Sequence, residues 1–195
     1  MTDKLAAVLR DIDTLNSADP RTETVDGKAR PRELVYAERM SDCLAKMYPG
    51  ASETLQIAAR AQHVRRWEIP RDSHPLGRAG YNAWRAQCRD HHAKLAFTVM
   101  LRHGYDAGAI AQVAKIIRKE ELKTDAESQA LENVVGAVFV AYYLAGFLAD
   151  HADYDEAKLL GILARTLRKM DRFGIDYVMR QELPEATRRL LMAAA

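Results

Sequence analysis

Two histidines of this sequence fall where helical spacing predicts a buried face. His63 follows Leu55 and Ala59 at intervals of four residues, so the three share one side of a helix. His92 follows Cys88 at the same interval. A histidine on an apolar face is either a hydrogen-bonded core residue or a ligand, and imidazole is a common ligand of zinc and iron.

Two glutamates extend this pattern to further helices. Glu38 follows Leu34 by one turn, and Glu132 precedes Val135 and Gly136 in a largely apolar stretch. A buried carboxylate is costly unless it is paired or bound to a cation. Two histidines and two glutamates form a ligand set for a divalent first-row transition metal, with iron, manganese and zinc as candidates. The alternative is that each is structural, and the sequence has no compact motif such as His-Glu-x-x-His.

An arginine-rich loop joins the two histidine-bearing segments. Residues 60–89 contain seven arginines and no lysine, with tryptophans and a tyrosine between them. Guanidinium groups favour bidentate recognition of phosphate or carboxylate, and neighbouring aromatic rings can stack on a base. The competing interpretation is that these arginines pair with internal carboxylates. The predicted substrate-binding residues are Arg65, Arg66, Arg71 and Arg78, with Trp67 and Trp84 for stacking.

Helical periodicity dominates the rest of the chain, and no stretch alternates convincingly at period two. We therefore expect an all-α fold, a compact single-domain bundle of seven or eight helices. Residues 1–30 are interpreted as an N-terminal helix and linker, and residues 31–195 as the helical domain. The expected helices span residues 3–16, 31–48, 52–67, 81–102, 106–119, 125–151 and 155–170, with a short one from about 185.

Composition limits the classes of partner and compartment. The chain has 195 residues, 48% of them hydrophobic, and a net charge of only +2, so global charge predicts no partner. Cys43 and Cys88 are far apart and read as reduced thiols, which favours a cytoplasmic location. The most apolar stretch, residues 134–148, is interrupted by glycines and tyrosines. It is interpreted as a buried helix, so no membrane partner is expected.

Long stretches of the sequence resemble a known family. ELVYAERM, AARAQHVRRWEIPR, GYNAWR, HHAKL and LKTDAESQALENV together resemble domain-of-unknown-function family 4202 over most of the chain after the first helix. The resemblance implies no activity. The family pattern has an acidic residue where this chain has Asn133, which leaves Glu132 as the candidate ligand there.

A more distant likeness is to the HD-domain metal-dependent phosphohydrolases. Under this likeness Glu38 stands at the first-ligand position and His63 at the histidine of the His-Asp pair. The paired aspartate falls at Val64, which cannot bind metal, so the defining doublet is missing. The likeness implies an HD-like helical fold with a site between helices rather than standard HD hydrolysis.

These features predict a metal-dependent enzyme, a hydrolase acting on a phosphorylated or nucleotide-like substrate. The metal would activate water, and the arginines would hold the anion. Two alternatives stay open: an iron-dependent oxygenase on the same scaffold, and a non-catalytic module that binds RNA or a nucleotide. The sequence leaves open the substrate, the oligomeric state and the roles of His151, Asp125 and Glu127.

Overall fold

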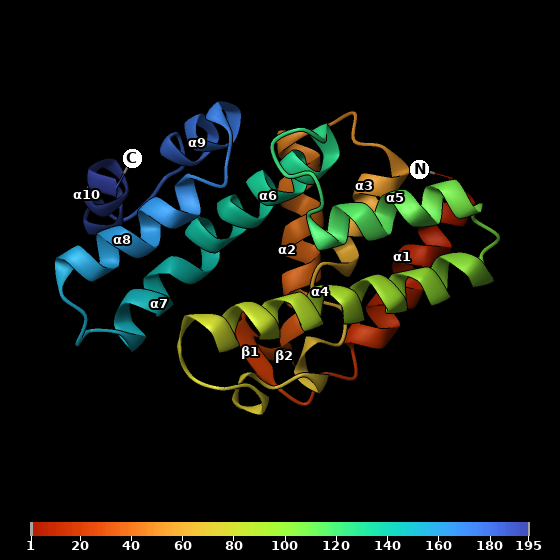
Figure 1. Ribbon diagram of the computed structural model, residues 1–195, viewed down its shortest axis with the longest axis horizontal. Helices are drawn as coiled ribbons and strands as arrows, with labels where there is room; N and C mark the ends of the chain where they lie inside the picture. Colours follow the sequence, from red (N-terminus) through yellow and green to blue (C-terminus); the bar gives the residue numbers. More distant parts are fainter. Residues whose placement is uncertain (1, 195) are drawn as a thin grey trace. The chain divides into compact units, whose positions relative to one another are not determined.

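The protein is mostly helical, as predicted. In the computed structural model, which describes residues 2–194, helices account for 72% of the chain. The described residues form ten α-helices rather than seven or eight, together with one two-stranded hairpin that was not predicted. The chain divides into two compact units, Met1–Glu120 and Glu121–Ala195, shown in red to green and in green to blue in Figure 1.

The described residues of the first unit form five α-helices and the hairpin. Helix α1 packs against α2, α3 and α4, and α5 packs against α3 and α4. Helix α1, in the segment that we interpreted as an N-terminal helix and linker, therefore packs against three other helices of this unit. Its elements are α1 (Asp3–Asn16), β1 (Thr22–Val25), β2 (Lys28–Pro31), α2 (Arg32–Met47), α3 (Glu53–Ala61), the 3₁₀ turns η1 (Arg66–Glu68) and η2 (Arg71–Ser73), α4 (Gly77–Arg102) and α5 (Ala107–Arg118).

The hairpin occupies the segment that we interpreted as a linker. Strands β1 and β2 pair antiparallel, with Val25 opposite Lys28. Asp26 and Gly27 make the turn, and both have positive φ, +50° and +74°. An Asp-Gly pair is a common sequence for such tight turns, so a local signal for the hairpin was present. The strands are short and polar, so they lack the alternation of apolar and polar residues by which a half-buried strand is predicted.

Helix α3 ends six residues earlier than predicted. Its start is capped by Ser52, whose hydroxyl accepts a hydrogen bond from the backbone N–H of Leu55, 3.1 Å away. Its last residue is Ala61, and the chain then turns through Arg65, which has a left-handed φ of +50°. The backbone N–H of Arg65 donates to the side-chain oxygen of buried Asn16 at 3.1 Å. His63 therefore lies in a fixed turn rather than on a helix.

The second unit is a set of helices around one long apolar segment. Its elements are α6 (Ala126–Val138), the π-helical turn η3 (Phe139–Tyr143), α7 (Leu144–Asp150), α8 (Glu156–Leu167), α9 (Arg172–Met179) and α10 (Glu185–Ala194). Helix α9 was not predicted. The run Ala126–Asp150 is long and apolar enough to cross a membrane, with a mean hydropathy of 1.6 in its most apolar window. Half of that window is buried in the structure, as also happens in the core helix of a globular unit.

Candidate functional site

The first buried residue of α2 is polar. Glu33 is 4% exposed and begins a stripe that continues through Tyr36, Met40 and Leu44. This stripe lies one position away from the one we expected through Glu38. The sequence signal was present, because residues 33, 36, 37, 40, 44 and 47 follow helical spacing.

Glu33 is held by two residues from the segment before the hairpin, one at its backbone and one at its carboxylate. Asp19 accepts a hydrogen bond from the backbone N–H of Glu33 at 3.1 Å and from the guanidinium of Arg21 at 3.0 and 3.1 Å. Arg21 also donates to Oε1 of Glu33 at 2.8 Å. Burial raises the pKa of Glu33 above its ordinary value, although the charges of Arg66 and Arg21 act against this. Burial also acts against the Asp19 carboxylate, but hydrogen bonds from Arg21 outweigh it and lower the pKa of Asp19.

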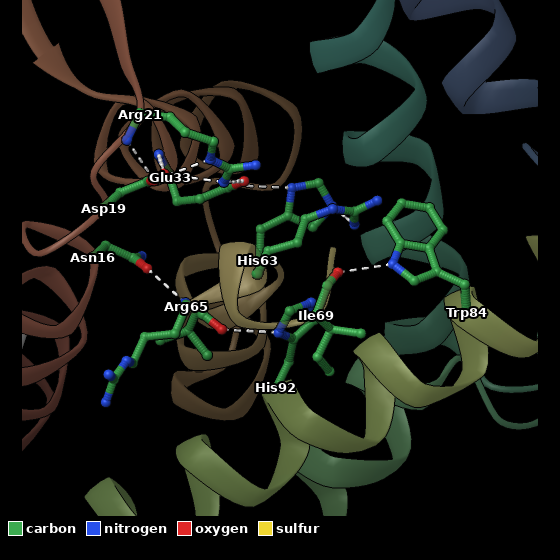
Figure 2. A network of polar contacts seen from close by, with 11 residues as sticks. Asn16, Asp19, Arg21, Glu33, His63, Arg65, Ile69, Trp84 and His92 are labelled. Carbon is green, nitrogen blue, oxygen red and sulfur yellow. Dashed lines mark hydrogen bonds and ion pairs between the residues drawn. The ribbon is translucent and has the colours of Figure 1, made fainter. Parts of the chain in front are cut away.

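His63 lies between this carboxylate and an arginine, as Figure 2 shows. Its Nδ1 is 3.3 Å from Oε2 of Glu33, and its Nε2 is 2.8 Å from Nη1 of Arg66. A guanidinium group has no acceptor, so Nε2 must accept and the ring proton must lie on Nδ1, facing Glu33. The ring stacks on Tyr36, with centroids 3.9 Å apart and planes 13° apart. These contacts define one tautomer of a neutral imidazole.

Burial, together with the surrounding cations, keeps His63 neutral. Burial is the largest cause that lowers the pKa of His63 well below 6.5. Four cations lower it further, in the order Arg66, Arg85, Lys119 and Arg32. The His63 side chain is still 20% exposed, so solvent reaches part of it. The site therefore combines a neutral, oriented imidazole with an excess of positive charge.

Arg66 is fixed on its other side by an aromatic ring. Its guanidinium carbon lies 4.5 Å from the centre of the Trp84 ring. Trp84 is itself held, because its indole N–H donates to the carbonyl oxygen of Ile69 at 2.9 Å (Figure 2). Burial lowers the pKa of Arg66 from its ordinary value. Arg66 thus faces His63 from a position set by the loop between η1 and α4.

His92 lies next to His63 but faces a different partner. It is 1% exposed, and its Nδ1 lies 2.9 Å from the carbonyl oxygen of Val64, so Nδ1 carries the proton. The rings of His63 and His92 are 5.9 Å apart between centroids. Burial first, and then the charges of His63 and Arg66, lower the pKa of His92 well below 6.5. Among residues 2–194 its Nε2 has no hydrogen-bond partner.

The four predicted metal ligands are only partly brought together. His63 and His92 are neighbours, whereas Glu38 forms an ion pair with Arg30 at 2.7 Å and has a side chain that is 32% exposed. Glu132 is buried, 6% exposed, in the second unit. Within the described part of the chain no three or more His, Cys, Asp or Glu residues are grouped so that they could hold a metal ion. Metal binding by these residues stays a prediction.

The other predicted arginines differ in their surroundings. Arg65 forms an ion pair with Glu68. Arg71 donates to the carbonyl oxygens of His74 and Pro75, each at 3.1 Å, and so ties the loop to itself.

The remaining residues of the predicted substrate set are less enclosed. Arg78 is exposed on the first turn of α4, and Trp67 is half-buried. Arg66 is therefore the member of the predicted set that meets the buried network. Sequence reasoning missed Asp19 and Arg21, because a polar connector gave no reason to expect a buried carboxylate with an arginine partner. It missed Glu33 because another face of α2 was expected to be buried.

A surface hollow beside the network has a different character. Its volume is about 620 Å³, and it shares Ile69 with the loop that holds Trp84. Carboxylates and a lysine mix on its wall, so its charge does not favour an anion. The lining residues are Glu68, Ile69, Gln87, Asp90, His91 and Lys94.

Comparison with known proteins identifies a family but no activity. A family model described as a domain of unknown function, DUF4202, matches residues 6–191. No curated protein and no solved structure matches the chain significantly. Nothing in these comparisons supports the distant likeness to HD-domain proteins.

Proposed function

The chain belongs to the DUF4202 family, which carries no assigned activity, and from the site itself we propose an enzyme that acts on a phosphorylated substrate. The observation that carries the proposal is the chain of contacts from Glu33 through His63 to Arg66. In the proposed reaction His63 is the general base and Arg66 binds the phosphate of the substrate. Metal dependence, and the iron-dependent oxygenase alternative, stay predictions that this proposal does not require.

His63 has the features of a general base. A carboxylate beside Nδ1–H fixes the tautomer and stabilises the imidazolium that forms when Nε2 takes a proton. Glu33 occupies that position, and Asp19 and Arg21 hold Glu33. The lowered pKa keeps Nε2 unprotonated at neutral pH. Stacking on Tyr36 restrains the plane of the ring.

Arg66 connects substrate binding to this base. In the structure it donates to His63 Nε2, and it has further N–H groups that can donate to an anion. A bound phosphate competes for the guanidinium, because a hydrogen bond between oppositely charged groups is stronger than one from a cation to a neutral imidazole. The Nε2 lone pair is then released next to the bound phosphoryl group.

The proposed step balances without a further reactant. A water or alcohol oxygen gives its proton to His63 Nε2 and attacks phosphorus. The bond from phosphorus to the leaving-group oxygen breaks, and that oxygen leaves with the electron pair and takes a proton from solvent. Arg66 and its cationic neighbours stabilise the charge on the phosphoryl oxygens during transfer.

The experiment uses the full chain and three variants. Wild type, His63→Asn, Arg66→Gln and the control Arg78→Gln are compared with a panel of phosphate mono- and diesters, with metal content measured in parallel. We expect wild type and the control to release product. His63→Asn should lose activity by at least about a hundredfold while the phosphate-induced rise in Tm persists. Arg66→Gln should lose both. Turnover unchanged in His63→Asn, or no Tm rise with phosphate, contradicts the proposal.

A second candidate function is a non-catalytic module that binds a nucleotide or RNA. It is favoured by the stacking of Arg66 on Trp84, a pairing of guanidinium and aromatic ring that such modules use. Phosphate binding that depends on Arg66, without turnover of any ester in the panel, would favour this candidate over the enzyme.

A further inference from the structure

Three side chains of the segment 60–89 already lie close to the ring of Trp84. Arg66 lies over its ring at 4.5 Å, and the guanidinium of Arg71 lies 5.9 Å from the same ring centre. The ring of Tyr81 meets it at 5.7 Å with planes tilted by 46°. The indole N–H of Trp84 donates to the carbonyl oxygen of Ile69, so the ring is anchored to the loop that precedes α4. It is therefore a support for Arg66 rather than a platform for a base.

Tyr81 is the exposed aromatic residue of the arginine-rich segment 60–89, in which Trp67 and Trp84 are partly buried. Tyr81 lies on the second turn of α4 and is 43% exposed. The guanidinium groups of Arg71 and Arg85 lie 5.9 and 6.0 Å from its ring centre. Arg85 also donates to the Tyr81 hydroxyl at 3.4 Å. An exposed ring flanked by guanidinium planes is the arrangement on which an unpaired base stacks.

These side chains form a row of contacts that begins at His63, the proposed general base. His63 contacts Arg66, Arg66 contacts Trp84, and Trp84 contacts Tyr81. The backbone that carries them is close-packed: a Cβ at Gly80 would lie 1.9 Å from the carbonyl oxygen of Pro75. Arg66 and the exposed ring of Tyr81 are therefore joined through Trp84, and the guanidinium of Arg71 lies 5.9 Å from the centres of both the Trp84 and the Tyr81 rings.

We infer that the phosphorylated substrate is a nucleoside phosphate, with its phosphate at Arg66 and its base stacked on Tyr81. This inference rests on the proposed function and adds the substrate class and the residue that selects it. A sugar phosphate would fill only the Arg66 end of the row. The base adds contact with the tyrosine ring, and Arg71 or Arg85 can cover the second face of the base.

The test compares three ligands that differ by one group each. Inorganic phosphate, ribose 5-phosphate and adenosine monophosphate are titrated into wild type, Tyr81→Ala, Tyr81→Phe and Phe97→Ala. Phe97 is the matched control, because it is a 49% exposed aromatic residue on the same helix. We expect adenosine monophosphate to bind wild type at least about fivefold more tightly than ribose 5-phosphate. Tyr81→Ala should lose this difference, whereas Tyr81→Phe and Phe97→Ala should keep it.

The outcomes separate this inference from the function on which it rests. If phosphate binds through Arg66 but the nucleotide binds no better than ribose 5-phosphate, the inference fails and the proposed function stands. A nucleotide preference that survives in Tyr81→Ala also overturns the inference. If none of the three ligands binds wild type, both fail. Melting temperatures of the unliganded variants establish that each is folded, and Tyr81→Phe retains an informative ring if Tyr81→Ala is unstable.

Discussion

The neutral state of the two buried histidines makes the stability of the protein depend on pH. Both His63 and His92 have a pKa well below 6.5 in the folded state, chiefly because of burial. Below pH 6.5 the unfolded chain binds these protons and the folded chain does not, so the free energy of unfolding falls as the pH falls. Above pH 7.5 neither state binds them and the effect vanishes.

The size of the effect follows from proton binding alone. Between pH 7.5 and pH 5.5, one histidine that stays neutral in the folded state removes about 1.4 kcal/mol of stability. Two such histidines remove about 3 kcal/mol over this range. Glu33 acts in the opposite sense, because its raised pKa lets the folded state hold a proton more readily. Its contribution is common to wild type and to a histidine variant, so it largely cancels when the two are compared.

The variant His92→Asn tests this without removing the donor to Val64. The asparagine side chain places an N–H near the position of Nδ1 and does not titrate. Urea unfolding at several pH values from 5.5 to 7.5 should give a fall in stability smaller by about 1.4 kcal/mol in His92→Asn than in wild type. The variant should also be less stable at pH 7.5, because a smaller side chain leaves a cavity. An equal fall in both proteins would refute the reasoning that His92 stays neutral.

Two other substitutions test packing and charge in separate places. Gly174→Ala should destabilise the protein by about 1–3 kcal/mol in urea unfolding, because the new Cβ would lie 2.6 Å from side-chain atoms of Asn133. The control Gly146→Ala, with nothing within 4 Å, should be neutral or stabilising by up to about 1 kcal/mol, and equal effects would contradict this account. Glu38→Gln should cost less than about 1 kcal/mol, because its ion pair with Arg30 lies at the rim. A loss of several kcal/mol that chelator reproduces in wild type would instead favour a metal role for Glu38.

The helices could be predicted from the sequence because their buried faces repeat at helical spacing and their starts carry caps. Asp106 and Asp155 each accept a hydrogen bond from a backbone N–H three residues later, and the helices that they cap begin where expected. The hairpin and α9 were missed. The hairpin has short polar strands, and α9 has only eight residues, too few for a clear period.

The candidate site was predicted in part, for reasons that lie in tertiary contacts. His63 was placed near the interior on the assumption of a continuing helix, but α3 ends at Ala61 and a turn tied to Asn16 carries it there. Glu38 was predicted because Leu34, one turn earlier, suggested that this face of α2 is buried, whereas the buried face carries Glu33. Arg21 belongs to a connector, and only the folded chain places it against Glu33.

The protonation state of His63 with and without phosphate tests the central claim most directly. Nitrogen NMR of the imidazole reports the tautomer and the pKa in one titration of wild type and Arg66→Gln. The account predicts a neutral ring with its proton on Nδ1 at pH 7. Phosphate should raise the pKa of His63, because it draws Arg66 away and brings a negative charge close. Arg66→Gln should abolish that rise. A proton on Nε2, or a pKa of His63 that phosphate leaves unchanged in wild type, would contradict the account.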